Sequence, residues 1–177
     1  MARGKQGALE PYATALRMLA RRGYSVAELR RALERKFPEH PGVREAIRRL
    51  RQLGYLDDKK FAEQYASSLA RQRALGPHRV RRELKAKLVD YKHIEPALQQ
   101  AYAETNEHEL LERVLEKKVR TLHLPVTPSR LSSLCQSLLR RGFRADDIMK
   151  AIHARPELRP VAEGAALTEL EGEAGQD

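Results

Sequence analysis

The apolar residues of this chain recur every three or four positions from Pro11 to Ala154, and they almost never alternate with polar residues. Spacing of three and four places apolar side chains along one face of an α-helix, whereas a half-buried β-strand requires a period of two. The sequence therefore predicts an all-α protein of nine short helices. With 177 residues, the chain has room for one domain or a short string of repeats.

The residues between the predicted helices are of the types that begin and end helices. Ser25 and Glu28 have the spacing of a capping box, and Thr127 precedes a proline that suits a first helical turn. A further N-cap is expected at Asp57 or Asp58. Four glycines lie just past predicted helix ends, where a left-handed residue closes the turn: Gly23, Gly54, Gly76 and Gly142.

Three of these glycines are each followed by an aromatic residue, which gives the chain a weak internal repeat. The pairs are Gly23-Tyr24, Gly54-Tyr55 and Gly142-Phe143. We expect each aromatic side chain to pack back on the helix before it, as a structural contact.

The repeated junctions predict a unit of three helices, used three times. Because such small units bury their cores against their neighbours, we expect an elongated, curved array. The predicted parts are a flexible N-terminus (1–10), three three-helix repeats (11–55, 56–104 and 105–154) and a disordered acidic tail (155–177).

Charge is distributed unevenly along the chain. The formal net charge is +10, but six acidic residues and one arginine lie after Arg155, which leaves about +15 on residues 1–155. A body this basic points to a polyanionic partner, with nucleic acid as the first candidate and a merely solvated surface as the alternative.

Helical-wheel positions single out the arginines most suited to such a partner. Arg44, Arg48 and Arg51 form a stripe beside the apolar face of their helix, and only Glu45 is near enough to relieve their mutual repulsion. The other candidates are predicted to face solvent on two further helices: Arg31, Arg35, Arg79 and Arg82.

Motifs for catalysis or for a cofactor are not found in the sequence. It has neither of the glycine-rich phosphate-binding motifs, and its single cysteine, Cys135, allows neither an internal disulfide nor a cysteine-rich zinc site. The acidic doublets Asp57-Asp58 and Asp146-Asp147 could hold Mg²⁺ for phosphodiester chemistry, but both open helices, where capping is the simpler interpretation. We therefore expect a protein that is not an enzyme, with no catalytic residue, metal or cofactor.

Two further expectations concern ligand type and location. The chain has no tryptophan, and its aromatic residues are expected in cores and turns, so sequence-specific reading of single strands is not expected. No apolar run reaches the length that crosses a bilayer and no signal peptide is present, which predicts a cytoplasmic protein without membrane contact.

Several motifs together resemble those of the RecX family, the regulators of the bacterial recombinase RecA. The most specific is Gly54-Tyr55-Leu56-Asp57-Asp58-x-x-Phe61-Ala62, followed by Gly76-Pro77-x-Arg79-Val80. Two supporting motifs lie on either side of it: Arg22-Gly23-Tyr24-Ser25 comes before it, and Gly142-Phe143 comes near the end of the match. The chain has Arg35-Lys36-Phe37-Pro38 and Leu88-Val89-Asp90 where the family has a glycine exit, and we expect these exits to use another turn.

The resemblance implies three tandem three-helix units without a catalytic centre. It also implies a role in DNA repair, homologous recombination and the SOS response: binding in the groove of the RecA filament on single-stranded DNA, with suppression of strand exchange, ATP hydrolysis and coprotease activity. The expected partners are the RecA filament and DNA, single-stranded first and double-stranded second, with the protein acting as a monomer. Two alternatives stay open: a general DNA- or RNA-binding helical repeat that acts without RecA, and a metal-dependent nuclease using Asp57-Asp58.

Overall fold

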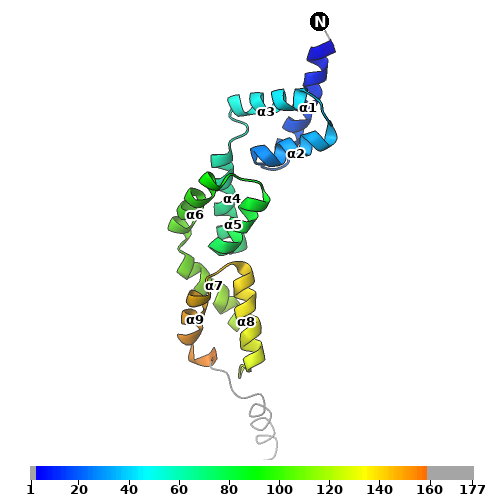
Figure 1. Ribbon diagram of the computed structural model, residues 1–177. Coiled ribbons are helices and arrows are strands. Elements are labelled where there is room, and N and C mark those ends of the chain that lie inside the picture. The colour runs from blue at the N-terminus through cyan, green and yellow to red at the C-terminus, as the bar shows by residue number, and fades with distance from the viewer. Residues whose placement is uncertain (1–2, 159–177) are drawn as a thin grey trace, which may run out of the picture. The chain divides into compact units, whose positions relative to one another are not determined.

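The computed structural model describes residues 3–158, with side chains from residue 10 onward, and this part of the chain is helical throughout, with no strand (Figure 1). The all-α prediction is therefore confirmed. None of these helices is long and apolar enough to span a membrane. The elements in chain order are α1 (Arg3–Leu19), α2 (Val26–Lys36), α3 (Gly42–Gln52), α4 (Asp58–Arg73), α5 (Pro77–Ala86), α6 (Tyr91–Thr105), α7 (Glu107–Val119), α8 (Pro128–Arg141), α9 (Ala145–His153) and the 3₁₀ helix η1 (Pro156–Leu158).

The described residues divide into two compact units. The first contains residues 3–68 and 81–101, and the second contains residues 69–80 and 102–158. Helices α4, α5 and α6 each contribute residues to both units, so the predicted repeat 56–104 is divided between the two units.

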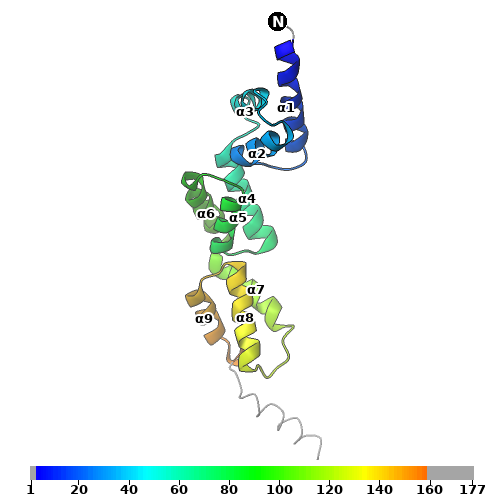
Figure 2. The ribbon, with the colours of Figure 1, turned by 45° about the vertical axis from the view of Figure 1, so that its right-hand side comes forward.

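The core of the first unit lies where α1, α2 and α3 pack together (Figures 1 and 2). Leu29, Leu33 and Leu50 are fully buried in it, each at a position that the apolar period predicted. Burial of a side chain of this size stabilises the fold by about 1.5–3 kcal/mol. The buried members of this core are Ala15, Leu29, Leu33, Val43, Ile47, Leu50 and Leu56.

A separate core in the second unit joins α7, α8, α9 and η1. Phe143 is its largest buried side chain and is 2% exposed. Cys135 of α8 is partly buried against this core, as predicted for a small hydrophobe, and burial raises the pKa of its thiol.

Both ends of the described chain correct the prediction. Helix α1 begins at Arg3, so residues 3–10 are helical, whereas the sequence predicted a flexible segment before Pro11. Proline inside a helix removes one hydrogen bond, but its fixed φ is helical, and here the helix continues through a buried Pro11.

At the other end, part of the segment predicted to be a disordered tail packs on the second core. Leu158 is 1% exposed, and Arg155 Nη2 donates to Glu112 Oε2 at 2.8 Å. The predicted fold ended at residue 154, where the apolar periodicity ends, and so left out Leu158, which adds apolar surface to the core. Residues 159–177, with the rest of the predicted tail, lie outside the described residues.

The predicted N-caps are confirmed. Ser25 Oγ accepts from the Glu28 amide at 3.0 Å, and Thr127 Oγ1 accepts from the Arg130 amide at 3.5 Å. Asp57, rather than Asp58, caps α4: its Oδ1 accepts from the amides of Lys59 and Lys60 at 2.9 and 3.1 Å.

The four glycines at helix ends serve two different purposes. Gly54 and Gly142 have φ of +74° and +94°, which confirms the left-handed closure. Gly23 and Gly76 do not have positive φ, so the prediction is wrong there. A Cβ on Gly23 would lie 3.2 Å from the Phe61 ring, a tight contact, whereas Gly76 is needed for space. A Cβ on Gly76 would lie 2.5 Å from the carbonyl carbon and oxygen of Gly142, because the two backbones touch.

The two exits without glycine differ from each other. After α2, Phe37 has φ −130°, so another turn is used, as predicted. After α5, the prediction is wrong, because Leu88 itself adopts φ +60°. The Leu88 amide donates to the Lys85 carbonyl, and the Val89 amide donates to the Leu84 carbonyl. This is the helix closure that a glycine normally provides.

Candidate nucleic-acid interface

Helix α3 carries the arginine stripe that the sequence predicted. Val43, Ile47 and Leu50 are 0–3% exposed and face the core of the first unit. Arg44 and Arg51 are exposed beside them, and so is Arg48. All three arginines line one groove.

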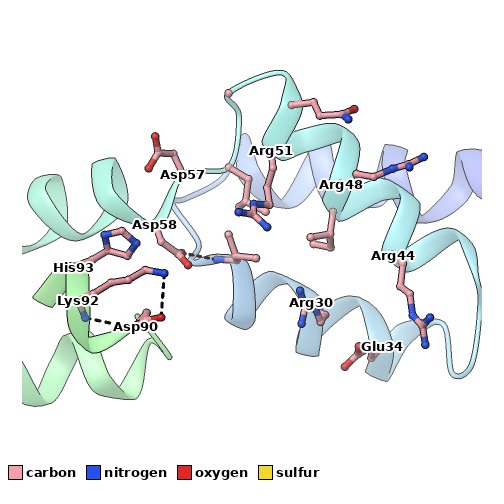
Figure 3. Close-up of a pocket in the computed structure, with 15 residues that line it drawn as sticks. Arg30, Glu34, Arg44, Arg48, Arg51, Asp57, Asp58, Asp90, Lys92 and His93 are labelled. Atoms are coloured by element: carbon pink, nitrogen blue, oxygen red, sulfur yellow. Dashed lines mark hydrogen bonds and ion pairs between the residues drawn. The ribbon is translucent and has the colours of Figure 1, made fainter.

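The groove has a volume of about 1100 Å³ and lies entirely within the first unit. Helices α2 and α3 form its walls along one part (Figure 3). Figure 3 shows Arg44 and Arg51 extending from α3 toward α2, where Arg30 and Glu34 lie. At its other end the lining consists of the α4 start and the α6 start: Asp57, Asp58, Asp90, Lys92 and His93.

The arginines of the groove are largely uncompensated. Arg48 Nη2 lies 2.5 Å from Glu45 Oε2, and this hydrogen bond raises the pKa of Arg48. Among the described residues, Arg30, Arg44 and Arg51 form no ion pair with a carboxylate. Like charges this close repel one another, and an anionic ligand would remove that cost.

Three of the four carboxylates that line the groove are engaged by helix ends, and the fourth, Glu34, is exposed on α2. Asp58 Oδ1 accepts from the Val26 amide at 2.8 Å, so it caps α2 rather than its own helix. Asp90 Oδ1 accepts from the Lys92 amide at 3.1 Å, and its Oδ2 lies 3.4 Å from Lys92 Nζ. The backbone hydrogen bond and then the lysine ammonium hold the pKa of Asp90 below its usual value.

The capping interpretation of Asp57-Asp58 is therefore confirmed, since the two side chains bind the N-termini of different helices. Within residues 3–158, no three acidic, histidine or cysteine side chains are grouped to hold a metal ion. The doublet thus has a structural use, and the arrangement of its carboxylates does not favour the nuclease alternative.

The other predicted arginines do not join this groove. Arg31 and Arg35 are exposed on α2, but each follows a groove-lining residue, Arg30 or Glu34, and is therefore rotated about 100° away from the groove. Arg82 is exposed on α5 as predicted. Arg79 is only half exposed, which corrects the prediction, because its backbone and Cβ lie against Gly142.

Arg30 of this groove was missed by the sequence analysis, and Tyr55, which follows the groove residue Gly54, was misplaced. Arg30 lies at the edge of the α2 apolar face, but only the packing shows that this edge faces α3. Tyr55 was predicted to pack back on its helix and is instead 62% exposed. Phe143, at the equivalent position in the second unit, does pack inward as predicted and is 2% exposed.

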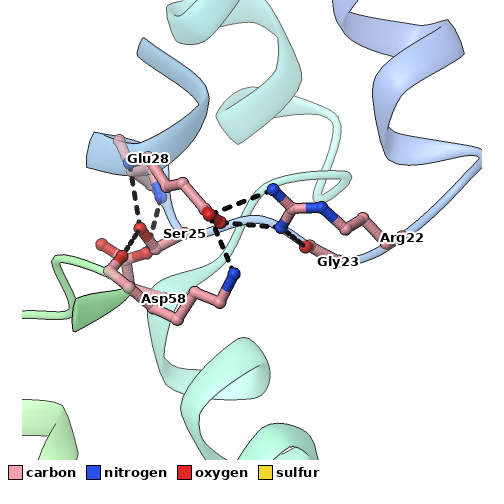
Figure 4. A network of polar contacts seen from close by, with 7 residues as sticks. Arg22, Gly23, Ser25, Glu28 and Asp58 are labelled. Carbon is pink, nitrogen blue, oxygen red and sulfur yellow. Dashed lines mark hydrogen bonds and ion pairs between the residues drawn. The ribbon is translucent and has the colours of Figure 1, made fainter. Parts of the chain in front are cut away.

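A polar network fixes the base of α2 against the starts and ends of neighbouring helices in the same unit (Figure 4). Ser25, fully buried, donates from its hydroxyl to the Lys87 carbonyl. The Glu28 carboxylate lies 3.0 Å from both Arg22 Nη1 and Lys87 Nζ. Burial acts to raise the pKa of Glu28, but the hydrogen bonds from these two cations outweigh it and set the pKa below its ordinary value.

These features define a class: an all-helical protein with a basic groove between short helices. Family models described as the first and second three-helix domains of RecX match residues 12–50 and 57–98. The chain belongs to the RecX family of regulatory proteins, which confirms the resemblance.

Individual relatives agree with this assignment. The chain is 33% identical over 139 residues to regulatory protein RecX of Chlorobaculum tepidum, which covers 78% of this chain and 83% of that protein. It is 29% identical to regulatory protein RecX of Trichlorobacter lovleyi, over 76% and 88% of the two chains. The crystal structure of RecX from Lactobacillus salivarius has the same fold, with a TM-score of 0.70, 24% identity, and coverage of 85% of this chain and 97% of that one.

Proposed function

We propose that this protein docks on the RecA–single-stranded DNA filament and inhibits or modulates the recombinase, ATPase and coprotease activities of RecA. Its membership of a family of regulatory proteins supports a regulatory role. One observation carries the assignment of the surface: Arg30, Arg44 and Arg51 line a single groove, and none of them forms an ion pair with a carboxylate of the described residues.

The chemistry of the groove suits the phosphates of a nucleic acid. Guanidinium groups bind phosphate oxygens through paired N–H donors, and each neutralised phosphate releases condensed counterions. Three of the four acidic residues of the groove, Asp57, Asp58 and Asp90, are bound to helix N-termini, and the groove's four arginines outnumber the remaining carboxylate, Glu34. Binding through this groove therefore weakens steeply as the salt concentration rises.

The proposal includes the arrangement of the chain as three tandem repeats, 11–55, 56–104 and 105–154, in an elongated and curved monomer in the cytoplasm. Such a shape gives a long surface that follows a filament groove. Small-angle scattering tests it: an elongated profile is expected, and a compact spherical one contradicts it.

The test replaces Arg44, Arg48 and Arg51 with glutamine. Glutamine keeps helix propensity and much of the aliphatic stem, and the three residues repel one another in the free protein, so the melting temperature should stay the same or rise slightly. Inhibition of RecA-driven strand exchange should become much weaker. A matched control removes the same charge elsewhere, from three exposed residues without a described partner in the second unit: Arg113, Lys117 and Arg140.

A triple variant that inhibits as well as the control contradicts the assignment of the groove. Binding of both proteins to RecA filaments, bare DNA and free RecA then separates the proposal from the alternative. Equal affinity of the wild-type protein for bare DNA and for filaments would favour a general DNA- or RNA-binding protein that acts without RecA.

A further inference from the structure

Tyr55 stands at the edge of a second groove that the proposed function does not use. This groove has a volume of about 460 Å³ and also lies within the first unit. Its walls are mainly apolar and aromatic, and Leu16, Leu19, Tyr24 and Phe61 line it together with Tyr55. The second groove and the basic groove share Gly54 and Asp57, so they meet at the linker between α3 and α4.

The backbone holds Tyr55 in a fixed place. The Tyr55 amide donates to the Leu50 carbonyl and the Gly54 amide to the Arg51 carbonyl, both at 3.0 Å, which is the Schellman closure of α3. Leu56, the next residue, is 3% exposed and anchors the chain in the core. An aromatic ring that is 62% exposed is therefore presented from a rigid support on both sides.

Charge along α3 separates two kinds of binding surface. Arg44 and Arg51 lie seven residues apart, which is about 10 Å of helix axis, and both line the basic groove. Tyr55 follows three residues after the end of α3 and carries no charge that could pair with a phosphate. A flat, uncharged aromatic group suits that position instead.

We propose that the second groove binds one unpaired base of single-stranded nucleic acid, stacked on Tyr55, while the adjoining phosphates lie on the arginines of the basic groove. This inference rests on the proposed function and adds that the surface selects single-stranded over double-stranded nucleic acid. A single strand carries phosphates and free bases side by side, which matches a cationic groove that meets an aromatic one at Gly54. A duplex keeps its bases stacked inside and offers Tyr55 no free face.

The chain has no tryptophan, which makes a specific probe available. Tyr55→Trp introduces a single fluorophore at the stacking position. Its emission should be quenched by oligo(dT), and much less by a duplex or by an abasic oligonucleotide of the same length. Tyr91→Trp is the matched control, because Tyr91 is 63% exposed on the same unit and lines neither groove.

An affinity measurement complements the fluorescence. Tyr55→Ala should weaken binding to oligo(dT) by about 5- to 150-fold, and Tyr55→Phe should restore it, since stacking on one aromatic ring contributes that much per base. Binding to duplex DNA of the same length should change less than twofold.

Three results would overturn the inference: equal quenching by the abasic strand, an unchanged affinity of Tyr55→Ala, or quenching by RecA alone, which would show that an apolar protein side chain fills the groove. None of these results tests the proposed function, which is tested separately by measuring how well the arginine variants inhibit RecA-driven strand exchange. Loss of inhibition in the arginine variant together with an inert Tyr55 would refute the base site alone.

Discussion

Replacement of Ser25 with alanine tests whether one buried hydroxyl joins two parts of the first unit. The Ser25 hydroxyl accepts from the Glu28 amide at the start of α2 and donates to the Lys87 carbonyl just after α5. The side chain is 0% exposed, so water cannot replace either bond. Alanine removes both bonds at once.

The expected cost has two parts. Loss of an N-cap costs about 1 kcal/mol. A buried carbonyl left without a donor costs about 1–3 kcal/mol more. The free energy of unfolding of Ser25→Ala should therefore fall by about 2–4 kcal/mol in urea denaturation followed by circular dichroism.

Two controls isolate the contribution of the bond to Lys87. Thr127→Ala removes the N-cap of α8 at a half-exposed site and should cost about 1 kcal/mol. Ser133→Ala changes an exposed serine inside α8 and should stay within about 0.5 kcal/mol of wild type. If Ser25→Ala costs no more than Thr127→Ala, the bond to the Lys87 carbonyl does not stabilise the protein and the reasoning fails.

Three further perturbations have definite expected outcomes. Gly76→Ala should lower stability by about 3 kcal/mol or more in thermal denaturation, because its Cβ would lie 2.5 Å from the Gly142 carbonyl. Gly54→Ala, with φ +74° and open space around it, should cost only about 1 kcal/mol. Similar losses in the two variants would contradict the contact between Gly76 and Gly142. The folded-state pKa of Glu28 is lowered, so its contribution to stability is present above the ordinary pKa of about 4.5 and is lost as the pH falls through the folded value. Glu28→Gln should therefore reduce stability at pH 7 and make its decline between pH 5 and 3 shallower, and parallel pH profiles would disprove this. A chain ending at Leu158 should melt at a higher temperature than one ending at Arg155, since only the first keeps the buried leucine, and equal melting temperatures would show that η1 contributes nothing.

The sequence by itself predicted the helices, three of their N-caps and the membership of the family. This succeeded because helix formation depends on neighbours three and four residues apart, and caps depend on residues two or three apart. The arginine stripe Arg44, Arg48 and Arg51 was found for the same reason, since all three lie on one face of one helix. The prediction failed where a residue departs from its usual preference: Leu88 adopts a left-handed conformation, and α1 continues through Pro11.

Contacts between residues far apart in the chain were decided only by the tertiary structure. Asp58 caps a helix that begins 32 residues earlier, and Gly76 is required by a backbone contact with Gly142. The periodic pattern shows which face of a helix is apolar, but it does not show which neighbour covers each edge of that face. For that reason the sequence could not distinguish Arg30, which lines the groove, from Arg31, which does not, nor show that Tyr55 stays exposed whereas Phe143 is buried.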